Sequence, residues 1–360
     1  MAKTLNQNFY NSLLTKPQIA IEELDLIYVN VNDMHIVRKK RDSGFCYLLH
    51  DKTVTEKREL DRINSLVIPP AWKKVKITEL PNGHLQAVGR DKKNRRQYRY
   101  HEDWMKIRNQ TKFYKLVSFA ESLPKIRAQV DKDLKREGWP KNKVVALIVK
   151  LMEETHIRIG NEQYAKRNKT YGLSTMRKRH INLYKERLRF EFVGKKGKKH
   201  KVTLRNKKLV RLVNQCEEIP GWELFKYYDA TGEKHSVDSG LVNDYIHKIS
   251  GYSFSSKDFR TWAASLIFFD ALYDMSRSKS KKIIKNNILT ALDMAAKGLG
   301  NSRNVCRNYY VHPYIVTAYE NGTIEKFFKK VNIDSSNAKW YSNSEIALLS
   351  LLKSYKPSFS

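Results

Sequence analysis

Two arginines stand where they could act on a phosphate group. Arg158 follows an apolar stretch, residues 142–155, and stands just before Gly160. Its planar guanidinium could bind two phosphate oxygens at once, although arginines at helix ends are also common for ordinary structural reasons. Arg260 lies among apolar residues in SSKDFRTWAASL (255–266), where its charge needs either an acidic partner or a phosphate.

A run of lysines occupies the sequence GKKGKKHK at residues 194–201. Its flanks, RLRFEFVG (187–194) and HKVTL (200–204), have the pattern of β-strands, so the run is predicted to be a hairpin tip. Such a tip is commonly a solvated loop, but a lysine on it could also enter a groove and protonate a leaving oxygen. Four lysines are equal candidates from the residues alone: Lys195, Lys196, Lys198 and Lys199.

A tyrosine and an asparagine share the segment GLGNSRNVCRNYYVHP, residues 298–313. The hydroxyl of Tyr310 would be a weak nucleophile at neutral pH, because the pKa of tyrosine is about 10, unless nearby positive charge stabilises the phenolate. Asn301 could donate a hydrogen bond to a phosphate oxygen, or could cap a short helix. Tyr310 is one of 20 tyrosines, so this segment alone does not indicate a nucleophile.

The composition indicates a polyanionic partner. The 360 residues include 69 Lys and Arg against 37 Asp and Glu, a formal net charge of +32. Nucleic acid suits this excess better than a membrane, since no stretch approaches the roughly 20 apolar residues of a spanning helix and the first residues do not resemble a secretory signal. Cys46, Cys216 and Cys306 are too far apart to indicate a disulfide framework or a zinc site. We therefore expect a cytoplasmic protein that meets nucleic acid.

The elements that must position these side chains fall into two regions. Residues 1–24 are expected to be a poorly ordered tail. Residues 25–103 are predicted to be a small β-rich domain with hairpins at RDSG (41–44) and at Asn82–Gly83. Residues 104–360 are predicted to be mostly α-helical, because apolar residues recur there at helical spacing. The predicted fold class is therefore α+β, with a β-hairpin inserted in the helical domain.

Local signals place several individual elements. The run LIYVNV (26–31) is rich in residues that favour strands. Ser255–Ser256 with Asp258 is typical of a helix start, and an apolar stripe from Ile284 is predicted to end at Lys297–Gly298. Three other segments are predicted to be helices: 54–64, 142–155 and 344–355.

Several segments in this order resemble the type IB DNA topoisomerases, above all the poxvirus-like and bacterial members. The resemblance covers roughly residues 25–320. It rests on five segments: GRDKKNRRQYRYHEDW (89–104), EETHIRIGNEQYAKRNKTYGLSTM (153–176), FEFVGKKGKKH (190–200), KDFRTWAA (257–264) and LGNSRNVCRNYYVHP (299–313). The fold that it implies for the helical domain is the catalytic domain shared by these enzymes and the tyrosine recombinases.

The resemblance also implies roles for particular residues. Tyr310 occupies the nucleophile position, and Arg158 and Arg260 occupy the positions of the two catalytic arginines. Lys195 matches the hairpin lysine that acts as general acid. Asn301 stands where poxvirus members carry histidine and bacterial members commonly carry asparagine, and it cannot become a cation. Five more residues match positions that contact DNA: Gln97, Tyr98, Tyr100, Tyr164 and Lys257.

The reaction implied is reversible cleavage of one strand of duplex DNA through a 3′-phosphotyrosine, which relaxes supercoils. The bond formed is a diester like the bond broken, so the step needs no ATP. No cofactor, metal ion or nucleotide is expected, and the sequence contains neither a G-x-x-x-x-G-K-[ST] loop nor an evident carboxylate cluster. The expected partner is double-stranded DNA, without a membrane, and the expected state is a monomer.

Two alternatives compete with this interpretation. A tyrosine site-specific recombinase shares the arginine–lysine–arginine–tyrosine chemistry, but recombinases usually carry histidine where this chain has Lys257, and the segment RRQYRYH (95–101) fits a topoisomerase better. A basic architectural DNA-binding protein would explain the charge, but not the ordered set of candidate residues. Covalent attachment of DNA to the protein separates the architectural alternative from both enzymes.

Overall fold

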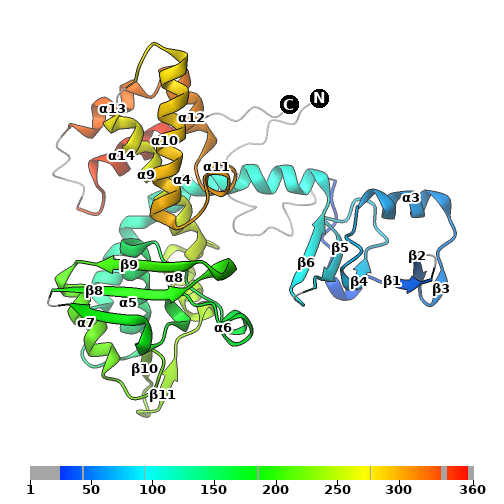
Figure 1. Cartoon of the computed structure of the whole chain (residues 1–360), viewed down its shortest axis with the longest axis horizontal. Coiled ribbons are helices and arrows are strands. Elements are labelled where there is room, and N and C mark those ends of the chain that lie inside the picture. The colour runs from blue at the N-terminus through cyan, green and yellow to red at the C-terminus, as the bar shows by residue number, and fades with distance from the viewer. Residues whose placement is uncertain are drawn as a thin grey trace. The chain divides into compact units, whose positions relative to one another are not determined.

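The computed structural model of this chain describes residues 25–42, 44–92, 94–184, 186–275, 277–333 and 339–355. The predicted tail, residues 1–24, lies outside the described residues. The chain forms two compact units, of which the first extends to Lys115 and the second begins at Leu116. We predicted a boundary near residue 103, whereas this division falls inside helix α4 (Glu102–Asp133), which Figure 1 draws in cyan.

The first unit is built on an antiparallel sheet. In its described residues the strand order is β3-β2-β1-β4-β5-β6. Ile63 of helix α3 (Lys57–Ser65) packs on Ile36, Val75 and Ile77 of the sheet, so the helix covers one face. The strands are β1 (Ile36–Arg41), β2 (Gly44–Leu49), β3 (Lys52–Thr53), β4 (Lys73–Ile77), β5 (Leu85–Arg90) and β6 (Arg96–Tyr100).

The two predicted hairpins of this unit are confirmed, but one predicted strand is wrong. Strands β1 and β2 pair with Arg41 opposite Gly44, and β4 pairs with β5 on either side of Asn82–Gly83. Residues 26–31 form no strand; Ile27 alone bridges to Gly83, and a 3₁₀ turn follows at Val31–Asp33. The Asn30 side chain accepts a hydrogen bond from the amide of Asn32 at 3.1 Å, and such local bonds compete with strand pairing.

The second unit is mostly helical, which confirms the predicted fold class. Strands β7, β8 and β9 form a small antiparallel sheet, and Figure 1 shows it in green beside helices α5 and α7. Its helices after α4 are α5 (Lys141–Thr155), α6 (Glu162–Asn168), α7 (Lys207–Glu217), α8 (Ser239–Ser250), α9 (Ser256–Asp274), α10 (Lys281–Leu299), α11 (Arg303–Tyr309), α12 (Pro313–Glu320), α13 (Glu325–Val331) and α14 (Asn343–Lys353). Its strands are β7 (Ile181–Tyr184), β8 (Arg187–Val193), β9 (Lys199–Leu204), β10 (Lys226–Tyr228) and β11 (Lys234–Ser236).

All five predicted helices are present, with shifts at some of their ends. The helix predicted at 54–64 begins at Lys57, and those predicted at 142–155 and 344–355 are α5 and α14. Ser255 caps α9 in a capping box with Asp258, as the sequence indicated. Helix α10 does not end at Lys297–Gly298 but continues to Leu299. It ends there because Gly300 takes the left-handed conformation (φ 63°) and its backbone N–H donates a hydrogen bond to the last turn of the helix.

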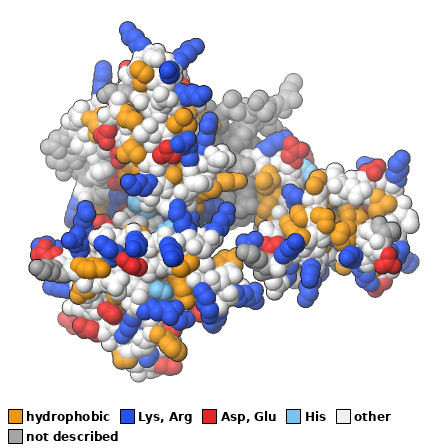
Figure 2. All heavy atoms as spheres, viewed as in Figure 1, with side chains coloured by type: hydrophobic (Ala, Val, Ile, Leu, Met, Phe, Trp, Pro, Cys, Tyr) orange, Lys and Arg blue, Asp and Glu red, His pale blue; other side chains and the backbone are white. Residues whose placement is uncertain are grey.

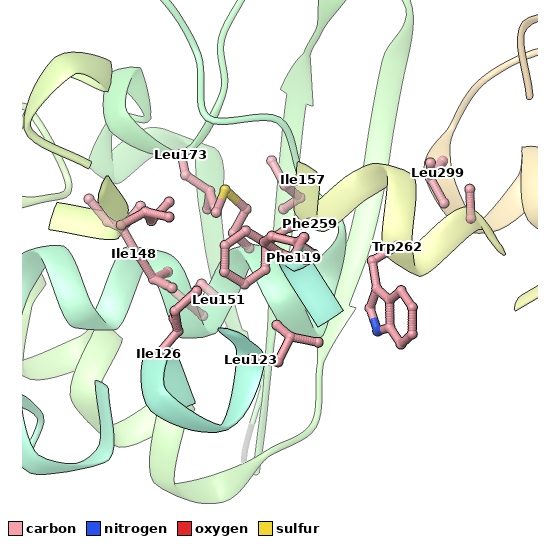
Figure 3. Close-up of a cluster of buried hydrophobic side chains, with 14 of the residues drawn as sticks. Phe119, Leu123, Ile126, Ile148, Leu151, Ile157, Leu173, Phe259, Trp262 and Leu299 are labelled. Carbon is pink, nitrogen blue, oxygen red and sulfur yellow. The ribbon is translucent and has the colours of Figure 1, made fainter. Parts of the chain in front are cut away.

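One hydrophobic core supports the second unit. The rings of Phe119 on α4 and Phe259 on α9 pack edge to face with centroids 5.0 Å apart, and Figure 3 shows Ile157 beside them. Leu299 belongs to the same buried cluster. Since Ile157, Phe259 and Leu299 each stand within two residues of a candidate site residue, the core fixes the backbone from which those residues project.

Helix α14 is tied to this core by a buried ion network. Arg127 of α4 pairs with Glu345 of α14 at 2.7 Å and with Glu153 of α5 at 2.7 Å. The indole nitrogen of Trp262 donates to Glu345 at 3.0 Å, so α14 also contacts α9. The C-terminal segment, for which the sequence suggested only an amphipathic helix, therefore supports the helix that carries Arg260.

Candidate active site

Tyr310 caps the end of α11 and is held by its backbone. Its amide donates to the carbonyl of Cys306 at 3.0 Å, and its own carbonyl accepts a hydrogen bond from Ser265 Oγ at 3.2 Å. The same Oγ accepts from the amide of His312 at 3.1 Å. The Tyr310 side chain is half-buried, whereas the neighbouring Tyr309 is 58% exposed. The backbone thus fixes Tyr310 from both sides.

Arg260 is buried against this tyrosine. Its side chain is 4% exposed, and its guanidinium carbon lies 5.6 Å from the centre of the Tyr310 ring. It donates to the carbonyls of Leu299, at 2.9 Å, and of His156. Within the part of the chain that the structure describes, its Nε is buried without a hydrogen-bond partner. The guanidinium is therefore fixed in place and retains an unused donor.

Arg158 projects from a loop whose backbone passes very close to the backbone at Gly172. Its carbonyl accepts from the amide of Leu173 at 2.9 Å, and the carbonyl of Ile159 accepts from Ser174 at 2.7 Å. A Cβ atom on Gly172 would lie 2.4 Å from the carbonyl oxygen of Arg158 and 2.5 Å from the amide nitrogen of Gly160. Glycine at position 172 is therefore required for this crossing, which sets where Arg158 begins.

Asn301 completes the group that we call the catalytic cluster: Arg158, Arg260, Asn301 and Tyr310. Asn301 follows the left-handed Gly300, and its backbone N–H donates to the carbonyl of Ala296 at 2.9 Å. Its side-chain oxygen accepts a hydrogen bond from Arg158 Nη2, while its side-chain nitrogen lies 3.9 Å from the sulfur of Cys306. The fold thus brings together four residues that are up to 152 positions apart in the sequence (310 − 158).

The charges of the cluster favour the phenolate form of Tyr310. Burial alone would raise the pKa of Tyr310, but the charges of Arg260 and Arg158, a hydrogen bond from Arg260 and the charge of Lys257 outweigh it and lower the pKa. Burial, and then the charge of Arg158, lower the pKa of Arg260 to about 10, so it stays a cation at neutral pH. Burial and Arg260 also lower the pKa of His156, which leaves its ring neutral there.

The predicted hairpin is present, and we call β8, β9 and the tip Gly194–Lys198 the lysine hairpin. It pairs from Leu188 with Leu204 to Val193 with Lys199. Lys195 is exposed on the tip. Lys198 lies nearer the catalytic cluster: its ammonium donates to the carbonyl of Gly300, the residue before Asn301, at 3.2 Å. Strand β7 and the β10–β11 hairpin were not predicted.

The residues expected to contact DNA are distributed over both units. In the first unit Tyr98 and Tyr100 share one face of β6, with ring centroids 5.9 Å apart, while Gln97 points to the opposite face and donates to Asp91 at 3.0 Å. A hollow of about 610 Å³ beside them is lined in part by Tyr98, Tyr100 and Arg99. The structure therefore does not place the three predicted β6 residues on one surface.

In the second unit the other two predicted DNA contacts are exposed. Tyr164 on α6 is 46% exposed. Lys257 is exposed in the first turn of α9, three residues before Arg260, and its charge reaches Tyr310. Both side chains are therefore accessible from solvent, and their contact with DNA stays a prediction.

Sequence reasoning missed four residues that shape the site. Gly172 permits the loop crossing, Ser265 holds the backbone around Tyr310, and His156 accepts from Arg260 through its carbonyl. His200, on β9 of the lysine hairpin, packs against the Gly300 turn. A serine inside the otherwise apolar stretch WAASLIFF (262–269) was a usable signal, since a buried hydroxyl needs a partner; the other three gave none.

Possible metal ligands gather at two places in the described ranges. One is His35, His50 and Glu79, and the other is Asp229, Glu233 and His235. Neither group includes a residue of the catalytic cluster. Among the same residues, no helix has the length and apolar character needed to cross a membrane.

Comparisons with known proteins agree with the geometry. The family model "Eukaryotic DNA topoisomerase I, catalytic core" matches residues 101–335, and "Bacterial DNA topoisomerase IB, N-terminal domain" matches residues 44–91. DNA topoisomerase 1B of Acanthamoeba polyphaga mimivirus is 34% identical over 330 residues, covering 89% of this chain and 95% of that protein. DNA topoisomerase 1B of vaccinia virus (strain Copenhagen) is 23% identical, covering 69% of this chain and 77% of that protein.

A solved structure of the XerH site-specific recombinase, bound to difH substrate before cleavage, is a more distant neighbour. It is 16% identical and covers 53% of this chain and 49% of that chain, at a TM-score of 0.35. That likeness is too weak to favour the recombinase alternative, whereas the family model covers 235 of the 360 residues (101–335). The chain belongs to the type IB DNA topoisomerases.

Proposed function

We propose that this protein relaxes supercoiled DNA by cutting and rejoining one strand, with Tyr310 as the nucleophile. The observation that carries the assignment of roles is the packing of the buried Arg260 guanidinium against the Tyr310 ring. Family membership supports the reaction, and the lowered pKa of Tyr310 supports the identity of the nucleophile.

In the cleavage step, the Tyr310 oxygen attacks the phosphorus of a backbone phosphate and loses its proton to solvent. A new P–O bond forms to the tyrosine while the bond from phosphorus to the 5′ oxygen breaks. The product is a 3′-phosphotyrosine and a free 5′ hydroxyl. Because one phosphodiester replaces another, the hydroxyl can attack in the reverse direction and restore the strand without a nucleotide.

The guanidinium groups of the cluster would stabilise the transition state. Attack adds negative charge to the non-bridging phosphate oxygens, and donors that are already in place meet this charge without reorganisation. Arg260 offers its unused Nε, and Arg158 offers the part of its fork that does not bond Asn301. The amide of Asn301 would add a neutral donor once a phosphate replaces its present contacts.

The leaving oxygen needs a proton, and we assign its delivery to Lys195. The 5′ oxygen would otherwise depart as an alkoxide, which is a poor leaving group. Lys195 is exposed on the tip of the lysine hairpin, so it is free to approach bound DNA. Lys198 is the alternative donor, since its ammonium already lies at the Gly300 carbonyl.

Double-stranded DNA is the proposed partner. The excess of basic residues supplies phosphate contacts that do not depend on base sequence, and Figure 2 shows lysine and arginine side chains over much of the visible face of the second unit. We propose that the protein acts as a monomer, without nucleotide or membrane. A cytoplasmic location with the chromosomal DNA agrees with the three cysteines being free thiols.

The test is a plasmid relaxation assay in EDTA without ATP, followed by a denaturing gel for protein-linked DNA. Wild type is expected to relax both positive and negative supercoils and to form a 3′-linked adduct, and activity should fall steeply as salt rises. Tyr310→Phe should bind DNA but form no adduct. Tyr309→Phe is the matched control, because its exposed ring lies one residue away, and it should behave as wild type.

Three outcomes would contradict the proposal. Adduct formation by Tyr310→Phe but not by Tyr309→Phe would make Tyr309 the nucleophile. A strict need for magnesium or nucleotide would contradict the reaction proposed. Strand exchange between two duplexes, with no relaxation of a single plasmid, would support the recombinase alternative.

A further inference from the structure

One histidine of the lysine hairpin packs against the turn that leads into the catalytic cluster. His200 on β9 is paired directly with Phe192 on β8. Their rings are stacked, with centroids 5.1 Å apart and planes inclined by 13°. The ring of His200 is therefore fixed to the body of the hairpin rather than to its exposed lysine tip.

The other sides of the ring meet the backbone of two glycines. A Cβ atom on Gly194 would lie 2.6 Å from His200 Cδ2, and a Cβ atom on Gly300 would lie 2.7 Å from His200 Cε1. Contacts this short cannot be tolerated in a close-packed interior, so both positions need glycine while the ring is in place. Gly194 precedes Lys195 and Gly300 precedes Asn301, so the ring touches the backbone beside both residues.

A continuous set of contacts leads from this ring to the catalytic cluster. Lys198 Nζ donates to the Gly300 carbonyl at 3.2 Å, on the same turn that the ring contacts. Gly300 is the left-handed cap of α10, and its backbone N–H donates hydrogen bonds to carbonyls of the last turn of that helix. The next residue, Asn301, accepts a hydrogen bond from Arg158. The hairpin and the cluster are thus joined through the Gly300–Asn301 turn.

The imidazole ring of His200 is uncharged in this position. Burial lowers the pKa of His200, and the charges of Arg158, Lys198 and Arg260 lower it further. At neutral pH the imidazole is therefore uncharged beside three cations. A neutral aromatic ring can pack against two glycines and a phenylalanine, but it is not a source of the proton that the reaction needs.

We propose that His200 is a positioning residue, which sets the lysine hairpin on the Gly300–Asn301 turn and so sets the reach of Lys195 to the leaving oxygen. This inference rests on the proposed function, in which the P–O5′ bond breaks, its electron pair goes to the 5′ oxygen and the Lys195 ammonium supplies the proton. A displacement of the tip by about 1 Å could cost on the order of 10²-fold in rate, because proton transfer depends steeply on geometry.

The test compares an ordinary duplex with one in which sulfur replaces the bridging 5′ oxygen at the cleaved phosphate. A thiol has a pKa of about 8.5, far below that of an alcohol, so a thiolate leaves without a proton. We expect Lys195→Ala to slow single-turnover cleavage of the oxygen substrate by on the order of 10² or more. His200→Ala should slow it by about tenfold or more, and both variants should slow the sulfur substrate by less than about threefold.

A double variant tests whether His200 acts through the lysine. If it does, Lys195→Ala with His200→Ala should cleave the oxygen substrate within about threefold of Lys195→Ala alone, since residues that act as one unit are not additive. A further loss equal to that of His200→Ala by itself would overturn the proposal. So would an equal slowing of the oxygen and sulfur substrates by His200→Ala.

Conservative and matched variants separate positioning from folding. His200→Phe keeps a neutral ring and should recover to within about threefold of wild type, since packing rather than protonation is invoked. His247→Ala removes an exposed histidine of α8 in the same unit and should change neither substrate. If thermal unfolding shows that His200→Ala is not folded, His200→Leu, which cannot stack on Phe192, takes its place.

The design also separates this proposal from the assignment of Lys195. If Lys195→Ala slows both substrates equally but His200→Ala remains selective for oxygen, Lys195 is not the donor, and His200 places another lysine of the hairpin. If Lys195→Ala is selective and His200→Ala is not, the proposed function stands and the role of His200 is wrong. If neither is selective, both assignments fail.

Discussion

The catalytic cluster and the tip of the lysine hairpin are held in opposite ways. Arg260 is almost completely buried and donates to two backbone carbonyls, and Arg158 begins at a loop crossing that only glycine permits. Lys195, by contrast, is exposed on a short turn. Groups that stabilise transition-state charge gain most from being fixed in advance, whereas a proton donor must reach a substrate that is absent before binding. The contrast therefore fits the two roles that we propose, charge stabilisation for the arginines and proton donation for Lys195.

The largest effect is expected from removing the buried arginine. Arg260→Ala should reduce single-turnover cleavage by on the order of 10²–10³, the usual cost of losing one fixed donor to a transition state. Arg260→Lys keeps the charge but loses the planar fork, so it should recover only part of the rate. Rapid quench measures the rate of cleavage. A loss below about tenfold in Arg260→Ala would mean that the buried guanidinium does not stabilise the charge of the transition state.

The same variant should shift the pH dependence of cleavage. Arg260 lowers the pKa of Tyr310, so in wild type the reactive phenolate is populated at a lower pH than for an ordinary tyrosine. Removing the guanidinium takes this effect away, and the pKa rises. The increase of rate with pH should therefore move to higher pH in Arg260→Ala. A profile that does not move would contradict the role of Arg260 in activating Tyr310.

A smaller loss is expected from disturbing how the other arginine is placed. In Gly172→Ala the added methyl group would meet the Arg158 carbonyl at 2.4 Å, so the loop must shift. A shift of about 1 Å could reduce cleavage by about 10- to 100-fold. Gly240→Ala is the matched control, because a Cβ atom on that exposed glycine of α8 would meet only the side chain of Asp238, with the nearest atom at 3.0 Å. Equal rates for the two variants would show that the crossing is unimportant.

The ion network under α9 should affect stability more than rate. Glu345→Gln breaks a buried pair and should lower the free energy of unfolding by about 2–4 kcal/mol, with Arg127 still paired to Glu153. Hydrogen bonds and charge from Arg127 hold the pKa of Glu345 low despite its burial. The stability that the Glu345 carboxylate contributes is therefore present above its unfolded-state pKa, and it is lost as pH falls through its folded-state pKa. Urea unfolding at two pH values measures it, and cleavage by folded Glu345→Gln should stay within about threefold of wild type.

The smallest effect is expected at the exposed strand of the first unit. Tyr98 is 42% exposed on β6, and Tyr98→Ala should weaken binding to duplex DNA by about three- to tenfold without changing cleavage at saturation. Tyr98→Phe separates the ring from the hydroxyl. Titration of a labelled duplex at fixed salt measures the change. A loss in the saturated rate would place Tyr98 nearer the chemistry than its exposed position indicates.

The sequence predicted the identities of the cluster residues but not how they are held. Arg158, Arg260, Asn301 and Tyr310 stood in recognisable segments, and the structure brings them together. The contacts that hold them are long-range: a serine in an apolar stretch indicates that the Ser265 hydroxyl needs a partner, but no local pattern identifies the carbonyl of Tyr310 as that partner. Packing between distant segments decides these contacts, and hydrophobic periodicity carries no information about them.

Secondary structure shows the same division between local and distant causes. Helices α5 and α9 were predictable because their apolar spacing and capping residues are local signals. The run at 26–31 was misread, because strand propensity there is weaker than the local hydrogen bond at Asn30 and the packing of Val29 in the unit's core. The presence of the lysine hairpin was predictable, whereas its docking through His200 was not.

The bond between Trp262 and Glu345 has a consequence for the newly made chain. Domains form as units during synthesis, and Glu345 is added after Tyr310. Tyr310 therefore exists on the ribosome before the ion network that supports the helix of Arg260 can close. An unfinished chain would therefore present Tyr310 while α9 still lacks its bond to the C-terminal helix, so the second unit reaches its full stability only after translation has passed Glu345.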